Sequence, residues 1–147
     1  MAAGILRSLL PPEVAGRTEV RSAGTGAVER APATVLAVQT CAEHSIDVST
    51  HHASSLSAVL LREADLILGM EPQHLDVARK LAPDSAGRLH LVTEHGATPG
   101  GSTAASVWDP VGGTADQYRD TFNRIRSHLL EWVPRIRDAV ERREGVR

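Results

Sequence analysis

The stretch DLILGM, residues 65–70, is a continuous apolar run of the length of one strand. A strand with one face in water alternates apolar and polar residues, whereas a parallel strand covered by helices on both faces is apolar throughout. The stretch therefore predicts a buried parallel strand over Asp65–Met70. A helix over Pro72–Leu81 is expected directly after it, because proline is favoured in the first turn of a helix.

Helices and strands alternate on both sides of this run. Apolar residues at helical spacing predict helices, and short alternating or apolar runs predict strands. Strands separated by helices indicate a parallel sheet covered on both faces. We therefore expect an α/β fold, a three-layer sandwich around a short parallel sheet, in a single domain over residues 1–147. The expected helices are Met1–Leu10, Thr34–His44, Ser57–Ala64, Pro72–Leu81 and Thr114–Arg142, and the expected strands are Thr18–Ser22, Asp65–Met70 and Arg88–Thr93.

Proline and small residues mark the expected boundaries. Pro11 and Pro12 are expected to end the first helix, because the residue before a proline avoids helical backbone angles. Pro134 is expected to kink the last helix or to split it in two. The stretch Glu94–Val107 is rich in Gly, Ser, Thr and Ala, which predicts a loop.

Two helices carry apolar faces that predict the core. In the helix over Thr34–His44, the residues expected to point inward are Val35, Val38, Cys41 and Ala42. In the last helix, the apolar residues spaced by threes and fours are Tyr118, Phe122, Ile125, Leu129, Val133, Ile136 and Val140.

Composition excludes several classes of function. The net charge of −2 and the 3% of aromatic residues argue against a nucleic-acid binder, which needs basic surface and stacking platforms. A single cysteine excludes an internal disulfide and a multi-cysteine metal site. The seven histidines show no metal-ligand spacing, so we expect no metal and no cofactor. No apolar run is long enough to span a membrane and no signal peptide opens the chain, so we expect a cytoplasmic protein.

Five segments along the chain share a pattern with a known family. They are, in order, Val20–Gly26 (VRSAGTG), Asp47–Leu56 (DVSTHHASSL), Ala64–Glu71 (ADLILGME), Trp108–Gly113 (WDPVGG) and Tyr118–Ile125 (YRDTFNRI). Together they resemble the corresponding segments of the low-molecular-weight protein tyrosine phosphatases. The resemblance spans nearly the whole chain and implies the phosphotyrosine protein phosphatase I-like fold. It also implies hydrolysis of a phosphotyrosine protein or a small aryl phosphate through a cysteinyl-phosphate intermediate.

Three residues match functional positions of the family. Asp109 matches the general acid that protonates the leaving phenolate and then deprotonates the attacking water. Pro110 after it favours an extended backbone at Asp109, which suits a side chain that projects from a rigid loop. The resemblance also implies that Ser22 and His51 support the loop that binds phosphate.

The defining motif of the family, Cys-x5-Arg-Ser-Pro after a first strand, does not occur in the chain. The nucleophilic cysteine and the phosphate-binding arginine are therefore absent, and Cys41, which lies in the middle of a predicted helix, is expected to serve packing. The segment Met1–Arg7 resembles the helix that follows the motif. We therefore expect an N-terminally truncated chain that lacks the first strand and, in this 147-residue form, is inactive.

The chain also departs from the family at the substrate cleft, where Val28 and Val111 stand in places that often hold aromatic residues and Ser54 replaces an arginine. Two alternatives stay open. The first is an arsenate reductase of the same fold that uses a low-molecular-weight thiol. The second is a non-catalytic pseudophosphatase that binds a partner without turnover.

Overall fold

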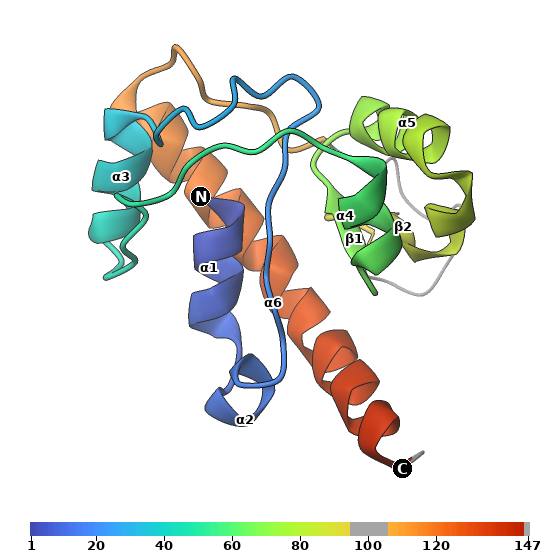
Figure 1. The fold of residues 1–147 in the computed structure, drawn as a ribbon. Coiled ribbons are helices and arrows are strands. Elements are labelled where there is room, and N and C mark those ends of the chain that lie inside the picture. Colours follow the sequence, from blue (N-terminus) through green and yellow to red (C-terminus); the bar gives the residue numbers. More distant parts are fainter. Residues whose placement is uncertain (95–105, 146–147) are drawn as a thin grey trace. The chain divides into compact units, whose positions relative to one another are not determined.

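The computed structural model describes residues 1–94 and 106–145, and it divides the chain into two compact units (Figure 1). The first unit comprises residues 1–22, 33–50 and 110–147, and the second comprises residues 23–32 and 51–109. The loop expected over Glu94–Val107 lies mostly outside the described residues. The expectation of a single domain over residues 1–147 stays a prediction.

The first unit is helical in its described part. It consists of α1 (Ala2–Leu9), α2 (Pro12–Ala15), α3 (Val35–Ala42) and α6 (Ala115–Gly145). Helices α1, α2 and α3 all pack against the long helix α6 (Figure 1). Their shared core contains fully buried side chains of every one of these helices, namely Ile5, Val14, Cys41, Phe122, Leu129 and Trp132.

The prolines act partly as expected. Helix α1 ends at Leu9, before Pro11, as predicted. The short helix α2 was not expected; it begins at Pro12, because a proline that cannot continue one helix is well suited to open the next. Pro134 lies inside α6 without splitting it. Pro134 and Leu130, one turn before it, are both exposed, so water can reach the carbonyl group that loses its helical partner there.

The inward face of α3 differs from the prediction. Val35 and Ala42 are exposed and the buried residues are Ala37, Thr40 and Cys41, so the expectation that Val35 and Ala42 point inward is wrong. Val35 is the first residue of the helix, where its N-terminal cap sets the orientation. Thr34 provides this cap: its hydroxyl accepts a hydrogen bond from the Ala37 N–H and donates one to the Tyr118 hydroxyl of α6 at 3.0 Å.

Polar contacts also join α3 to α6 at the other end of α3. The Arg119 guanidinium donates hydrogen bonds to the Glu43 carboxylate, with the shortest at 2.7 Å, and this contact holds the pKa of Glu43 below its usual value. The His44 ring stacks on the Phe122 ring with 4.1 Å between centroids. Helix α3 is therefore fixed to α6 at both ends.

The second unit holds the parallel sheet. Strand β1 (Ile67–Gly69) pairs in parallel with β2 (Leu89–Leu91), with Ile67 opposite Leu89 and Gly69 opposite Leu91. Helices α4 (Ala58–Glu63) and α5 (Pro72–Leu81) and the 3-10 helix η1 (Pro83–Arg88) complete this unit. Helices α4 and α5 and strand β2 supply the buried residues of one core, and Ile67 of β1 is partly buried against it. The buried residues are Leu61, Leu75, Ala78, Ala82, Leu89 and Leu91.

Two local features explain how α4 and β1 fit this core. The Arg88 guanidinium, just before β2, donates hydrogen bonds to the carbonyl groups of Arg62 and Ala64 at the end of α4. Those carbonyl groups lack partners within their own helix. The close packing of β1 on α5 requires glycine at position 69, because a Cβ there would lie 2.7 Å from Leu75 Cδ2.

The strand expected over Thr18–Ser22 is not present: in the described residues the sheet contains β1 and β2 alone, so this prediction is wrong. A strand needs a neighbouring backbone for its hydrogen bonds, and an alternating pattern does not provide one. The fold class itself, α/β with a short parallel sheet, is confirmed by the other elements and by the structural similarities given below.

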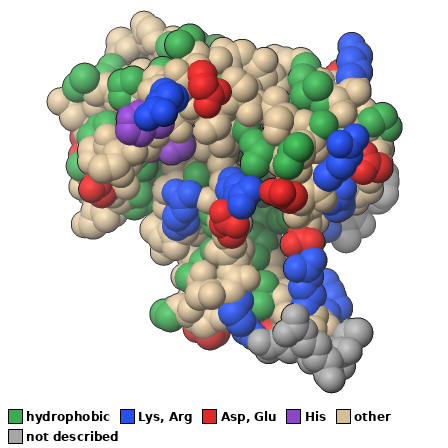
Figure 2. All heavy atoms as spheres, viewed as in Figure 1, with side chains coloured by type: hydrophobic (Ala, Val, Ile, Leu, Met, Phe, Trp, Pro, Cys, Tyr) green, Lys and Arg blue, Asp and Glu red, His purple; other side chains and the backbone are tan. Residues whose placement is uncertain are grey.

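Charged side chains of both signs lie among one another on the face drawn in Figure 2. In α6, for example, Arg137 lies 4.0 Å from both Asp138 and Glu141. The arginines of this helix are therefore partly offset by acidic neighbours.

Trp132 is the largest of the fully buried side chains in the described residues. Its side chain is 1% exposed, whereas that of Leu130 on the same helix is 42% exposed. We expect Trp132→Ala to lower the free energy of unfolding by about 3–5 kcal/mol, because it leaves a large cavity. Leu130→Ala serves as the control and should cost less than about 1 kcal/mol. Urea denaturation followed by circular dichroism measures both changes, and equal effects would contradict the packing described.

Candidate active site

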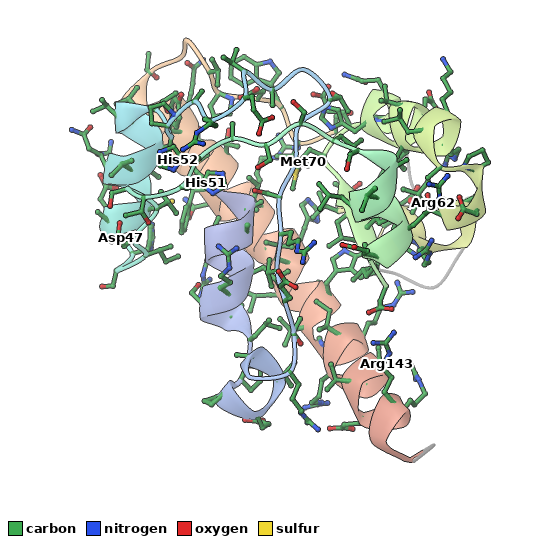
Figure 3. All side chains as sticks on the ribbon, in the orientation of Figure 1. Asp47, His51, His52, Arg62, Met70 and Arg143 are labelled. Carbon is green, nitrogen blue, oxygen red and sulfur yellow. The ribbon has the colours of Figure 1, made fainter. Side chains whose placement is uncertain are left out.

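Asp109 lies on a segment that is anchored to the end of β1. The Val107 N–H donates a hydrogen bond to the carbonyl group of Met70, the residue directly after β1, at 3.0 Å. Met70 is labelled in Figure 3. The Val107 side chain is buried, and Asp109 follows two residues later with an exposed side chain. The carboxyl end of a parallel strand is the edge where ligands usually bind in α/β folds.

The chain turns tightly after Asp109. Pro110 is buried, and its carbonyl group accepts a hydrogen bond from the Gly113 N–H at 2.8 Å. Gly112 has a φ of +81°, which glycine adopts at little cost. A Cβ on Gly113 would lie 2.9 Å from the Pro110 carbonyl oxygen and would also collide with the Gln117 side chain. Glycines at 112 and 113 are therefore what this turn requires.

The start of α6 is held by a reciprocal pair of hydrogen bonds. The Thr114 hydroxyl accepts from the Gln117 N–H at 3.3 Å, and the Gln117 side-chain oxygen accepts from the Thr114 N–H at 2.8 Å. This arrangement is a capping box, in which two backbone donors at a helix start find partners in side chains. The turn after Asp109 therefore runs directly into a fixed helix end.

Large apolar side chains flank Asp109 in the sequence. Trp108 before it is 56% exposed and Val111 after it is 64% exposed. An exposed aspartate can donate or accept a proton at the leaving oxygen of a bound ester. Its role as the general acid stays a prediction.

The segments that follow Ser22 and His51 lie side by side in the second unit. The Gly24 N–H donates to the Ser54 carbonyl group, and the Leu56 N–H donates to the Gly24 carbonyl group, both at 2.9 Å. Ser22 itself is exposed and His51 is half-buried. Backbone hydrogen bonds thus join the Gly-rich turn at residues 22–26 to the segment after His51. Asp109 lies on a different segment, which follows β1 in the chain. The supporting roles of Ser22 and His51 stay predictions.

Cys41 is the one cysteine of the chain, and it is fully buried in α3. Burial raises the pKa of its thiol, which favours the protonated and unreactive form. The prediction that Cys41 serves packing is confirmed. The described residues therefore contain no thiolate that could attack phosphorus.

No group of three or more His, Cys, Asp and Glu side chains that could hold a metal ion is found within residues 1–94 and 106–145. In the same part of the chain, no helix has the length and apolar character of a membrane span.

Comparison with known proteins identifies the family. The family profile described as "Low molecular weight phosphotyrosine protein phosphatase" matches residues 1–143. The chain belongs to this family. The resemblance noted in the sequence is confirmed, and it extends over nearly all of the chain.

Individual relatives agree with this assignment. The chain is 31% identical over 137 residues to the probable low molecular weight protein-tyrosine-phosphatase EpsP of Ralstonia nicotianae, covering 93% of this chain and 86% of that protein. It is similar in structure to a low molecular weight protein tyrosine phosphatase from T. tengcongensis, with a TM-score of 0.77, 28% identity, and coverage of 91% of this chain and 88% of that chain.

The same fold occurs in the YwlE arginine phosphatase from Geobacillus stearothermophilus. The TM-score is 0.79 at 24% identity, over 94% of this chain and 84% of that chain. At this level of identity the likeness concerns the fold alone.

Three features of this region were not predicted from the sequence. The capping box does have a sequence signal, Thr114-x-x-Gln117, which is typical of a helix start. The hydrogen bond from Val107 to Met70 has no such signal, because it joins residues far apart in the chain. The same holds for the Glu29 carboxylate, which accepts hydrogen bonds from the N–H and the hydroxyl group of Ser55 at 2.9 Å.

We expect Gly113→Ala to destabilise the turn after Asp109, because the new methyl group meets the Pro110 carbonyl oxygen and the Gln117 side chain. The expected loss is about 1–3 kcal/mol in the free energy of unfolding. Gly87→Ala is the control: a Cβ there has nothing within 4 Å, so its effect should be close to zero. Thermal denaturation compares the two, and an unchanged Gly113→Ala variant would contradict the turn described.

Proposed function

We propose that this protein is a cytoplasmic protein-tyrosine phosphatase, which hydrolyses tyrosine phosphate in proteins or small aryl phosphates. The observation that carries the proposal is the placement of Asp109 in a chain that belongs to this phosphatase family. Its carboxylate is exposed, beyond the end of β1, on a segment fixed by Val107 before it and followed by a glycine turn. A general acid needs both accessibility and a fixed position.

The proposed reaction has two steps. A cysteine thiolate attacks phosphorus and displaces the tyrosine oxygen, while Asp109 donates a proton to that leaving oxygen. Asp109, now ionised, then takes a proton from the water molecule that attacks the cysteinyl phosphate and releases inorganic phosphate. An arginine that grips two phosphate oxygens would stabilise both transition states.

We further propose that the cysteine and the arginine come from a segment that precedes residue 1 in the active form. Two observations support this part of the proposal. Strand β1 has the continuous apolar sequence of an interior strand, yet within the described residues it pairs on one edge alone. The stretch shared with the relative EpsP covers 86% of that protein, so EpsP contains residues, at one end or both, that the shared stretch does not include.

Which substrate the enzyme prefers can be tested directly. An arginine phosphatase shares this fold. Phosphotyrosine is favoured because the relative EpsP is named as a probable tyrosine phosphatase. Hydrolysis of phosphoarginine and reduction of arsenate are therefore assayed beside hydrolysis of a phosphotyrosine peptide.

We expect the 147-residue chain to show no hydrolysis of p-nitrophenyl phosphate above background, because it lacks the nucleophile. A form extended by the residues encoded directly upstream should hydrolyse this ester with a burst of p-nitrophenol. In that form, Asp109→Ala should lower kcat by about 10²- to 10⁴-fold. Asp120→Ala, which removes an exposed carboxylate from α6, is the matched control and should keep full activity.

Three other results would each contradict one part of the proposed function. Burst hydrolysis by the 147-residue chain would contradict the need for an added segment. Turnover of phosphoarginine or arsenate without turnover of phosphotyrosine would contradict the proposed substrate. An upstream sequence without Cys-x5-Arg would contradict the enzymatic function and leave the non-catalytic pseudophosphatase, which binds a partner without turnover.

A further inference from the structure

The carboxyl end of β1 binds two later segments through consecutive carbonyl groups. The Gly69 carbonyl group accepts a hydrogen bond from the Val92 N–H, directly after β2, at 2.9 Å. The Met70 carbonyl group accepts one from the Val107 N–H at 3.0 Å, two residues before Asp109. This second hydrogen bond is the anchor of the segment that leads to Asp109, so the position of that segment in the second unit depends on how firmly the backbone at Met70 is held.

Glu71, the next residue, lies between the anchor and helix α5. Its backbone is extended, and it is the N-terminal cap residue of α5, which begins at Pro72. The first turn of α5 packs closely on β1 through Leu75. Because a peptide group is planar, the Met70 carbonyl group and the Glu71 N–H move as one unit. A shift of Glu71 relative to α5 would therefore also move the acceptor of the anchor.

The carboxylate of Glu71 ties this residue to the first turn of α5. One oxygen accepts a hydrogen bond from the Gln73 side-chain amide at 2.8 Å, and the other lies 4.0 Å from His74 Nε2. The Glu71 carbonyl group also accepts a hydrogen bond from the His74 N–H at 3.0 Å. A negative charge near the N-terminus of a helix is favourable. Both the side chain and the backbone of Glu71 are therefore held by the helix.

Glu71 differs in its surroundings from Asp76, a second carboxylate on α5. The Glu71 side chain is 25% exposed, whereas the Asp76 side chain is 63% exposed. Asp76 pairs with Arg79 at 2.9 Å, and an exposed pair of this kind contributes little. A hydrogen bond to an ionised acceptor is stronger than one between neutral groups, and less water weakens it at Glu71. The carboxylate at the junction of β1 and α5 is therefore the better held of the two.

We propose that Glu71 is a positioning residue for the general acid: its carboxylate, held by Gln73, fixes the junction of β1 and α5 and thereby the carbonyl group that anchors the segment leading to Asp109. The inference rests on the proposed function, since it assumes that Asp109 protonates a leaving oxygen. It adds a residue that acts on the reaction through the backbone alone. The effect of Glu71 should therefore be larger for a substrate that depends more on this proton.

Four variants of the active, extended form test this inference. Glu71→Ala removes the acceptor, and Gln73→Ala removes its donor. Glu71→Gln removes the charge but keeps an oxygen that can accept the same hydrogen bond. Asp76→Ala is the matched control, because it removes an exposed carboxylate from the same helix. A thermal melt of each variant confirms that it is folded before kinetics are measured.

The first readout is kcat/KM for two aryl phosphates, which includes the step in which the leaving oxygen departs. Phenyl phosphate releases a weakly acidic phenol, as phosphotyrosine does, and needs the proton from Asp109 more than p-nitrophenyl phosphate does. For Glu71→Ala and Gln73→Ala we expect kcat/KM for phenyl phosphate to fall about tenfold, a part of the roughly 10²- to 10⁴-fold that a general acid contributes. For p-nitrophenyl phosphate the fall should stay below about threefold, and Glu71→Gln should resemble the wild type with both substrates.

The second readout is hydrogen exchange at the Val107 amide, which reports on the anchor and needs no activity. In the 147-residue chain, Glu71→Ala should make this exchange about fivefold faster, because the Met70 carbonyl group is then held less firmly. Asp76→Ala should leave both the exchange and the kinetics unchanged.

Contrary results separate the possible failures. An equal fall in kcat/KM for both phosphates would show that Glu71 acts on folding or phosphate binding, and would overturn its link to the general acid. An unchanged Val107 exchange rate in Glu71→Ala would overturn its hold on the anchor. Glu71→Gln behaving like Glu71→Ala would overturn hydrogen bonding as the cause. Absence of hydrolysis by the extended wild type would overturn the proposed function and the catalytic part of this inference, whatever the exchange rates show.

Discussion

The parallel pairing of β1 with β2 is the constraint on which the second unit depends. Each strand contributes three residues, and the helices α4 and α5 complete the core around them. The end of β1 also anchors the segment that leads to Asp109, because the Val107 N–H donates a hydrogen bond to the Met70 carbonyl group there. Asp109 lies two residues after this anchor and directly before the turn that contains Gly112 and Gly113.

Strand β1 pairs with β2 along one edge, and within the described residues no strand pairs with its other edge. A parallel strand with apolar residues throughout is built to lie between two neighbours, and a two-stranded sheet alone is marginal in water. The sequence DLILGM predicts a strand with a neighbour on each side, whereas β1 pairs with β2 alone in the described residues. An added strand at this edge would resolve the mismatch and would place a loop at the carboxyl end of the sheet, the end at which Asp109 lies.

Much of the fold could be predicted from local patterns, and the failures have physical causes. The prediction of α5 over Pro72–Leu81 was correct, since a proline start and an apolar spacing both lie within the helix itself. The prediction of a strand over Thr18–Ser22 was wrong because a strand depends on a partner that local sequence does not contain. The prediction for the inward face of α3 was partly wrong, because packing on α6 decides which side of α3 is buried and the apolar pattern of α3 does not contain its partner helix. For the site, the resemblance indicated Asp109 from a short stretch of adjacent residues, whereas the hydrogen bonds from Ser55 to Glu29 span 26 residues and left no local trace.

Arg88 has a consequence beyond its contact with α4. It stands directly before β2, and its guanidinium binds the last carbonyl groups of a helix that leads into β1. A slip of β2 by one residue would carry Arg88 about 3.3 Å along the strand and would turn its side chain toward the opposite face of the sheet. The arginine would then lose both carbonyl groups at once. A side chain outside the two strands thus favours the pairing in which Ile67 lies opposite Leu89.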